Sequence, residues 1–237
     1  MVNDKQWEAL FGFKRRDSEG EITQQHSNLA YAIQQVTEDI LLKMAMEAKR
    51  VTGAKNVCLA GGVALNCVGN GKLLRSKIFE DIFIQPAAGD AGGAIGAALA
   101  AYHLVFEKER IVQESDAMSG SYLGPEFTET EIEHTAKSFK ANYKKAEKFE
   151  DLSVEVAKLI SEGNVVGWFQ GRMEFGPRAL GNRSILGDAR NTEMQLKLNL
   201  KIKYRESFRP FAPSVLIEDN QEYFDIDKAS PYMLLVA

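Results

Sequence analysis

The chain has 237 residues, of which 45% are hydrophobic and 26% charged, a composition that argues against wholesale disorder. Its longest apolar runs are far shorter than the roughly 18 residues of a membrane-spanning helix. Residues 1–20 carry charges throughout, so no secretory signal is predicted. Cys58 and Cys67 lack the spacing of a zinc cage or a disulfide framework. We therefore expect a soluble, cytoplasmic α/β protein of one large or two ordinary domains.

The net charge of −4 argues against general nucleic-acid binding, but the charge is unevenly distributed. Residues 172–209 contain nine Lys and Arg against four acidic residues, which is a local charge of +5 and leaves −9 on the rest. A basic cluster on an acidic protein indicates a small anionic ligand rather than a long polyanion. A solvated basic surface is the alternative.

The first half of the chain has the pattern of an α/β unit. Residues 27–51 place apolar side chains at steps of three and four, which predicts an amphipathic helix ending at Gly53. Apolar runs at 56–60 and 81–85 predict two strands, each followed by glycines. Strand, glycine turn and helix in succession are typical of a sheet with ligand loops at the carboxyl ends of its strands.

The periodicity lapses over residues 107–125, where we expect a boundary between two α/β units. Thr128 and Glu131 then form a capping-box pattern that predicts a helix to about Lys140. Further helices are expected at 152–160 and 192–202, and strands at 144–149, 164–170 and 212–217. The predicted domains are residues 1–112 and 113–237.

Two glycine-rich segments of the first unit are candidate ligand loops. Gly61 and Gly62 follow the first strand, and paired glycines let a backbone approach a ligand while the next helix directs its N–H groups at phosphate. Asn66 can add a side-chain hydrogen bond, although a tight structural turn explains the glycine pair equally well.

The second segment, residues 87–101, contains twelve Gly or Ala among fifteen residues and one charged residue, Asp90. Its backbone N–H groups can form an anion nest, and Asp90 can bind a metal ion whose charge offsets the cost of holding a carboxylate there. Helix capping by Asp90 is the alternative.

Two arginine-rich loops in the second unit are stiffened by prolines. The segment 175–185 contains Arg178 and Arg183, and the segment 203–213 contains Lys203 and Arg209. Rigid arginine forks are suited to phosphate or carboxylate, whereas a solvated surface does not require rigidity. These loops therefore favour an anion-binding site.

Four strings in this order, LAGGVALN, GDAGGAIGAAL, FQGRMEFGPRALGNRSIL and KYRESFRPFAPSVL, resemble the carbamoyltransferases of the NodU/CmcH type. The resemblance covers nearly the whole chain. It implies part of an actin/sugar-kinase-like (ribonuclease H-like) domain followed by part of an α/β twisted-sheet carbamoyltransferase C-terminal domain. It also implies activation of carbamoyl phosphate with ATP as a carbamoyladenylate, and transfer of the carbamoyl group to a hydroxyl of a sugar- or antibiotic-like acceptor.

The resemblance assigns roles to individual residues. Carbamoyl phosphate is expected at Arg178, Lys203 and Arg209, with Arg172 and Arg183 as weaker candidates. ATP is expected at the nucleotide loops, and a divalent metal ion, iron or magnesium, at Asp90. The expected nucleotide-loop residues are Gly61, Gly62, Asn66, Gly92 and Gly93.

One departure from the family pattern concerns histidines. The family's first domain supplies an HxxxH pair to the metal, whereas the chain has only His26, His103 and His134, none with that spacing. We therefore expect a fragment, inactive alone, that lacks the N-terminal part of its protein and can self-associate through the faces left exposed. The residues 233–237 suggest a strand cut short.

Two alternatives remain open from the sequence. The first is a phosphotransferase of the actin and sugar-kinase type, which the glycine loops alone suggest. The second is a non-catalytic nucleotide- or anion-binding module. Neither alternative involves a membrane or a nucleic acid.

Overall fold

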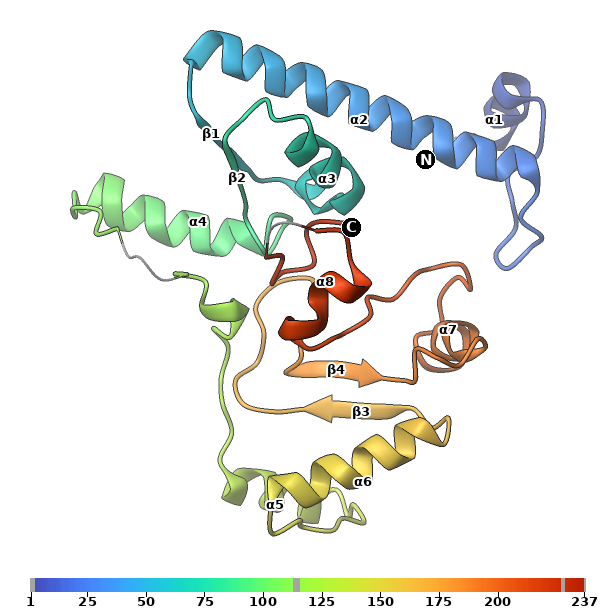
Figure 1. Cartoon of the computed structure of the whole chain (residues 1–237), viewed down its shortest axis with the longest axis vertical. Helices are drawn as coiled ribbons and strands as arrows, with labels where there is room; N and C mark the ends of the chain where they lie inside the picture. The colour runs from blue at the N-terminus through green and yellow to red at the C-terminus, as the bar shows by residue number, and fades with distance from the viewer. Residues whose placement is uncertain (1–2, 113–115, 227–228, 237) are drawn as a thin grey trace.

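The computed structural model describes residues 3–112, 116–226 and 229–236 (Figure 1). Each half of the chain contains one two-stranded sheet. Parallel strands β1 (Asn56–Leu59) and β2 (Asp81–Ile84) pair with Asn56 opposite Asp81, and antiparallel strands β3 (Val166–Phe169) and β4 (Arg183–Leu186) pair with Val166 opposite Leu186. The mixture of helices and strands agrees with the α/β expectation. Within the described ranges neither sheet has a third strand, so the actin-like and twisted-sheet folds stay predictions.

The helices of the first half follow the sequence pattern closely. The long helix α2 ends at Gly53, whose φ of 64° is the left-handed conformation that glycine adopts without a Cβ clash. The helical elements of this half are α1 (Asp4–Phe11), α2 (Gln24–Thr52), the 3-10 turn η1 (Gly62–Leu65), α3 (Cys67–Arg75), α4 (Gly92–Ala100) and the π-turn η2 (Ala101–Val105).

The second half opens with the predicted capping box. Thr128 accepts a hydrogen bond from the backbone of Glu131, and the Glu131 carboxylate accepts one from the backbone of Thr128, so α5 begins there. The helical elements of this half are η3 (Ser119–Ser121), α5 (Glu129–Ser138), α6 (Phe149–Ser161), α7 (Met194–Lys197), the π-turn η4 (Leu198–Ile202), η5 (Ile217–Asp219) and α8 (Asn220–Tyr223).

Three strand predictions differ from the structure. The strand expected at 144–149 is wrong: that segment is a loop, and Phe149 begins α6, whose first turn carries two acidic residues that favour a helix N-terminus. The strand expected at 212–217 is also wrong, because Pro213 cannot donate to a ladder. The apolar residues 233–236 form no strand, whereas β4 lies in a segment that we expected to be loop.

A contiguous apolar core lies around the first sheet and includes a segment from the far end of the chain. Leu73, Ile82 and Ile84 are buried there together with Leu234. Asn70, which has no exposed surface, donates from Nδ2 to the carbonyl of Leu234 at 3.0 Å. Figure 1 shows the C-terminal segment beside α3. Residues near 234 therefore pack in the first core, a contact that a simple division at 112/113 does not anticipate.

Helix α2 contacts the rest of the chain through a face that mixes apolar and polar residues. Ala45 is buried in the apolar core and Leu41 packs against that core. Glu38 is only 4% exposed and pairs with Lys72 at 2.8 Å, while Gln34 donates to the same carboxylate at 2.8 Å. The apolar stripe that predicts this helix lies on its solvent-exposed side instead. Five of its residues are more than half exposed: Ile33, Val36, Ile40, Met44 and Val51.

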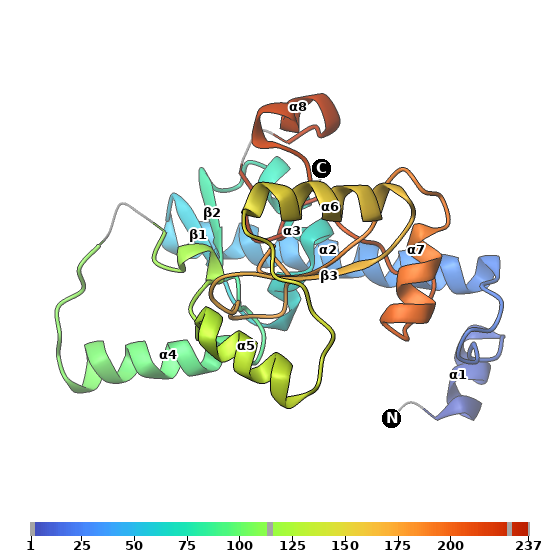
Figure 2. The same ribbon diagram turned by 90° about the horizontal axis from the view of Figure 1, so that it is seen from below.

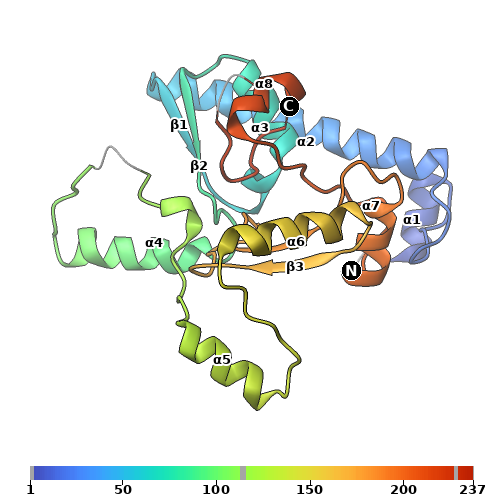
Figure 3. The same ribbon diagram turned by 60° about the horizontal axis from the view of Figure 1, so that its bottom comes forward.

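Helices α4 and α5 extend away from both sheets (Figures 2 and 3). The surface of α4 is apolar, and no residue of this helix is buried. In the parts of the chain that the structure describes, no helix is both long enough and apolar enough to cross a bilayer.

Candidate functional site

Three loops that the sequence singles out line one hollow of about 430 Å³. Gly62 and Leu65 come from the loop after β1, Gly89 and Asp90 from the loop after β2, and Gly176 and Pro177 from the loop between β3 and β4. The structure therefore brings the two glycine-rich segments of the first half together with the first arginine loop of the second half.

The glycines of the two candidate nucleotide loops have distinct structural tasks. Gly61 has a φ of 97° and donates to the carbonyl of Ala88 at 2.8 Å, which joins the loops that follow the two strands. A Cβ on Gly92 would lie 2.2 Å from the carbonyl oxygen of Ala87, so only glycine permits this approach, whereas a Cβ on Gly93 would meet open space. The backbone N–H groups of Gly92 and Gly93 donate within their own turn, so they are not open donors for an anion.

Asn66 holds the loop after β1 against the helices. Its Oδ1 accepts from the backbone N–H of Gly69 at 3.0 Å and so caps α3. The same amide exchanges hydrogen bonds with the Gln34 side chain of α2. This structural task accounts for Asn66, and a contact with nucleotide stays a prediction.

Asp90 is exposed at the cleft and does not act as a helix cap. The N-cap of α4 is Ala91, and no side chain caps this helix. Among the described residues no group of three or more His, Cys, Asp or Glu is arranged to hold a metal ion. Asp90 can therefore supply at most part of a metal site, and we assign no reaction step to a metal.

Arg178 connects the two halves of the chain. Its Nη2 donates to the carbonyl of Leu65 at 3.1 Å, and its Nε is buried without an acceptor among the described residues. A buried guanidinium N–H without an acceptor is costly.

Among the described residues that line the hollow, none belongs to the second arginine loop, residues 203–213. It follows η4, which comes after the carboxyl end of β4, whereas Arg178 precedes β4. No hydrogen bond or ion pair in the described part of the chain joins Arg178 to Lys203 or Arg209. The three-residue pocket for carbamoyl phosphate therefore stays a prediction.

The candidate cations of both arginine-rich regions differ in their contacts. Arg209 pairs with Glu206 at 2.7 Å, which lowers the pKa of the Glu206 carboxyl and raises the pKa of Arg209. Arg205 donates from Nε to Oδ1 of Asn199 at 2.7 Å and lies 4.9 Å from the ring centroid of Phe211. Lys203, Arg172 and Arg183 are exposed and have no side-chain hydrogen bond or ion pair within the described ranges.

Arg16 is a neighbour of this loop that the sequence analysis missed. Its guanidinium lies 5.8 Å from the ring centroid of Phe208, and its charge contributes to the lowered pKa of Glu206, after the larger effect of Arg209. The basic run of residues 14–16 is the only signal in the sequence, and nothing in that signal indicates the contact.

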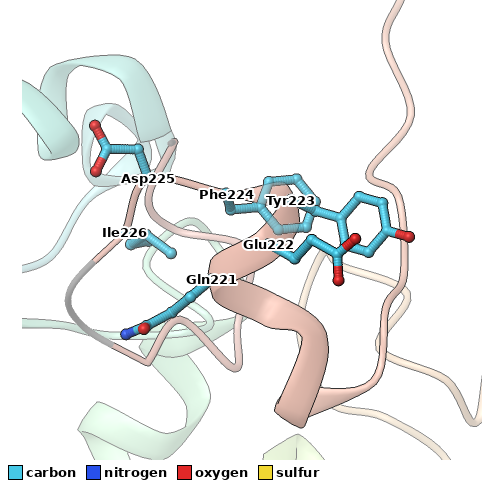
Figure 4. Close-up of a pocket in the computed structure, with 6 residues that line it drawn as sticks. All are labelled: Gln221, Glu222, Tyr223, Phe224, Asp225 and Ile226. Atoms are coloured by element: carbon cyan, nitrogen blue, oxygen red, sulfur yellow. The ribbon is translucent and has the colours of Figure 1, made fainter.

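A second hollow, of about 440 Å³, lies around α8 and is lined by the consecutive residues 221–226 (Figure 4). The carboxylates of Glu222 and Asp225 point away from each other there. Because its side chains diverge and come from one short segment, this hollow does not have the character of a binding site.

Two glycine loops, a carboxylate and one arginine loop around a single cleft are typical of a site for phosphorylated ligands. Two family models match the chain: Carbamoyltransferase N-terminus over residues 1–99 and Carbamoyltransferase C-terminus over residues 157–237. The chain belongs to the NodU-type carbamoyltransferase family. Residues 100–156 lie between the two matches, so the predicted domain boundary stays a prediction.

Three relatives illustrate the relationship. An uncharacterized protein (sll1178) of Synechocystis sp. is 57% identical over all of this chain, which spans 38% of that protein. Nodulation protein NolO of Bradyrhizobium diazoefficiens is 43% identical over 90% of this chain and 39% of its own length. Nodulation protein U of Sinorhizobium fredii is 34% identical over 80% of this chain and 31% of its own length. The chain thus spans less than two fifths of each relative.

Proposed function

We propose that the chain is part of an ATP-dependent O-carbamoyltransferase. The proposed protein activates carbamoyl phosphate as a carbamoyladenylate and transfers the carbamoyl group to a hydroxyl of a sugar- or antibiotic-like acceptor. The observation that carries the proposal is the cleft in which Gly62, Asp90 and Gly176 meet, because these residues come from both carbamoyltransferase regions.

The roles of the loops follow from charge. Water would cleave carbamoyl phosphate to carbamate and phosphate, and a carbamate oxygen would then attack the α-phosphorus of ATP and displace pyrophosphate. Negative charge builds up on the departing oxygens in both steps. Arg178, Lys203 and Arg209 would neutralise that charge, with weaker contributions from Arg172 and Arg183. The backbone at Gly61 and Gly62 would approach the nucleotide, since no side chain stands in the way.

A divalent metal ion, iron or magnesium, is part of the proposal. When bound, it would act as a Lewis acid on the carbamoyl group or the acceptor hydroxyl. Asp90 is its proposed ligand in this chain. The remaining ligands would come from the part of the relatives' length that this chain does not span, where we expect an HxxxH pair.

The test compares this chain with a version extended by its flanking coding sequence to the length of the relatives. With ATP, carbamoyl phosphate, metal and a hydroxylated acceptor, we expect carbamoyl transfer from the extended protein and none from the 237-residue chain. In the extended protein, Asp90→Asn should abolish transfer and leave pyrophosphate release largely intact. ATP binding without turnover by the extended protein would instead favour the non-catalytic binding module.

A further inference from the structure

One asparagine of the second half is completely buried and directs its side chain at the second arginine loop. Asn199 has no exposed surface and lies in the π-turn η4. Its Nδ2 donates to the carbonyls of Ser207 at 3.0 Å and Arg209 at 2.8 Å. Its Oδ1 accepts from Arg205 Nε at 2.7 Å, and its backbone carbonyl accepts from the Arg205 N–H at 3.0 Å.

These four bonds fix the loop at both ends. Arg205 is held at the start, and the carbonyls of Ser207 and Arg209 are held at the end. Gln195, on α7, adds a bond from Nε2 to the Arg209 carbonyl at 3.1 Å. Both polar atoms of the Asn199 side chain therefore form their hydrogen bonds with the loop.

The backbone of the same loop is strained where it begins. Tyr204, between Lys203 and Arg205, has a φ of 48°, which is common for glycine but uncommon for a bulky residue. Strain of this kind persists only where surrounding contacts enforce it, and it concentrates at binding and catalytic sites together with π-turns. A solvated basic surface needs no buried clamp, whereas positive φ also occurs at exposed residues such as Lys77 and Lys140.

We propose that Asn199 is a positioning residue that presets the loop of Lys203 and Arg209 for a phosphoryl oxyanion. Through Asn199 the loop is ordered before the ligand arrives, so binding does not have to order it. The inference rests on the proposed function, since it takes that loop as the carbamoyl-phosphate site. What the inference adds is that hydrogen bonds from Asn199 fix the conformation of this loop.

The experiment measures carbamoyl-phosphate binding to the 237-residue chain by calorimetry, with ATP titrated separately as the other source of phosphoryl oxygens. We expect Asn199→Ala to weaken carbamoyl-phosphate binding about tenfold, Gln195→Ala about threefold, and neither to change ATP binding by as much. The salt dependence of binding should stay unchanged, because both substitutions leave every charge in place.

Asn70→Ala is the matched control. Asn70 is equally buried and likewise donates from Nδ2 to two carbonyls, those of Ala64 and Leu234, but it lies in the first half. Both asparagine variants should lose thermal stability, and only Asn199→Ala should lose carbamoyl-phosphate affinity. Equal affinities for the two variants would overturn the inference.

Two further results separate this inference from the function on which it rests. If Asn199→Ala does not fold, Gln195→Ala decides, and an unchanged affinity there overturns the inference. The double variant Lys203→Met, Arg209→Gln tests the loop itself. If the double variant binds carbamoyl phosphate with wild-type affinity, or if the unaltered chain does not bind it, the proposed site and the clamp are both overturned. If the double variant loses binding while Gln195→Ala and Asn199→Ala bind normally, only the clamp is overturned.

Discussion

In the first half of the chain the fully buried Leu73 packs with Phe79 and Ile82, whereas in the second half the fully buried side chain under the arginine loop is Asn199. The first sheet is thus stabilised by contiguous apolar burial, which is non-directional. The second arginine loop is placed by hydrogen bonds, which fix direction as well as distance. Substitutions in each half of the chain test this contrast.

The largest expected effect comes from Leu234, the residue of the C-terminal segment that packs in the first core. Leu234→Ala should lower the free energy of unfolding by about 2–4 kcal/mol, because the cavity adds to the lost burial. Chemical denaturation measures it, and Leu104→Ala, at a position 78% exposed, is the control. A loss no larger than in the control would mean that the segment does not belong to that core.

Arg178 makes one of the polar contacts between the halves, alongside the bond from Asn70 to Leu234. Arg178→Lys keeps the charge and loses the planar fork, so carbamoyl-phosphate affinity should fall by about 1.5–3 kcal/mol, or roughly ten- to a hundredfold. Arg190 is a poor control because it forms a two-pronged pair with Asp188, at 2.9 and 2.8 Å. Arg110→Lys, at an exposed position, is the control. Equally small effects of both substitutions on carbamoyl-phosphate affinity in calorimetry would favour the alternative that the basic loops are a solvated surface.

A matched pair of glycines tests the tight turn within the second glycine-rich segment, residues 87–101. Gly92→Ala should destabilise the chain by about 1–3 kcal/mol, because the new Cβ would clash with the Ala87 carbonyl. Gly93→Ala meets open space within α4 and should be neutral or stabilise by up to about 1 kcal/mol. Thermal melts of both variants measure the difference, and melting temperatures that change alike would contradict the tight turn.

The smallest effect concerns acid pH. Hydrogen bonds from the side chain and backbone of Arg190 lower the pKa of Asp188 to about 2. A lowered pKa stabilises the fold above the unfolded value near 4 and loses that contribution as the pH falls toward about 2. Unfolding free energies of Asp188→Asn should therefore depend less on pH than wild type between about pH 4 and 2. Parallel pH curves would argue that this polar pair does not stabilise the second half.

The sequence by itself determined the elements whose signals are local. The stripe at residues 27–51, the terminal Gly53 and the Thr128–Glu131 capping box each encode a helix boundary or face within a few residues, and all three are present in the structure. The four family strings likewise identify the carbamoyltransferase family without any knowledge of the fold.

Only the tertiary structure decided how those elements are used. Periodicity shows that α2 has an apolar stripe, but the helix packs through a different face. Ala45 and Leu41 of that face meet the apolar core, while Glu38 pairs with Lys72 and Gln34 with Asn66. In the same way, arginine count and proline spacing predict an anion site, but they do not distinguish Arg205, held by Asn199, from the exposed Lys203. That distinction depends on residues brought together by folding, and their spacing in the sequence does not encode it.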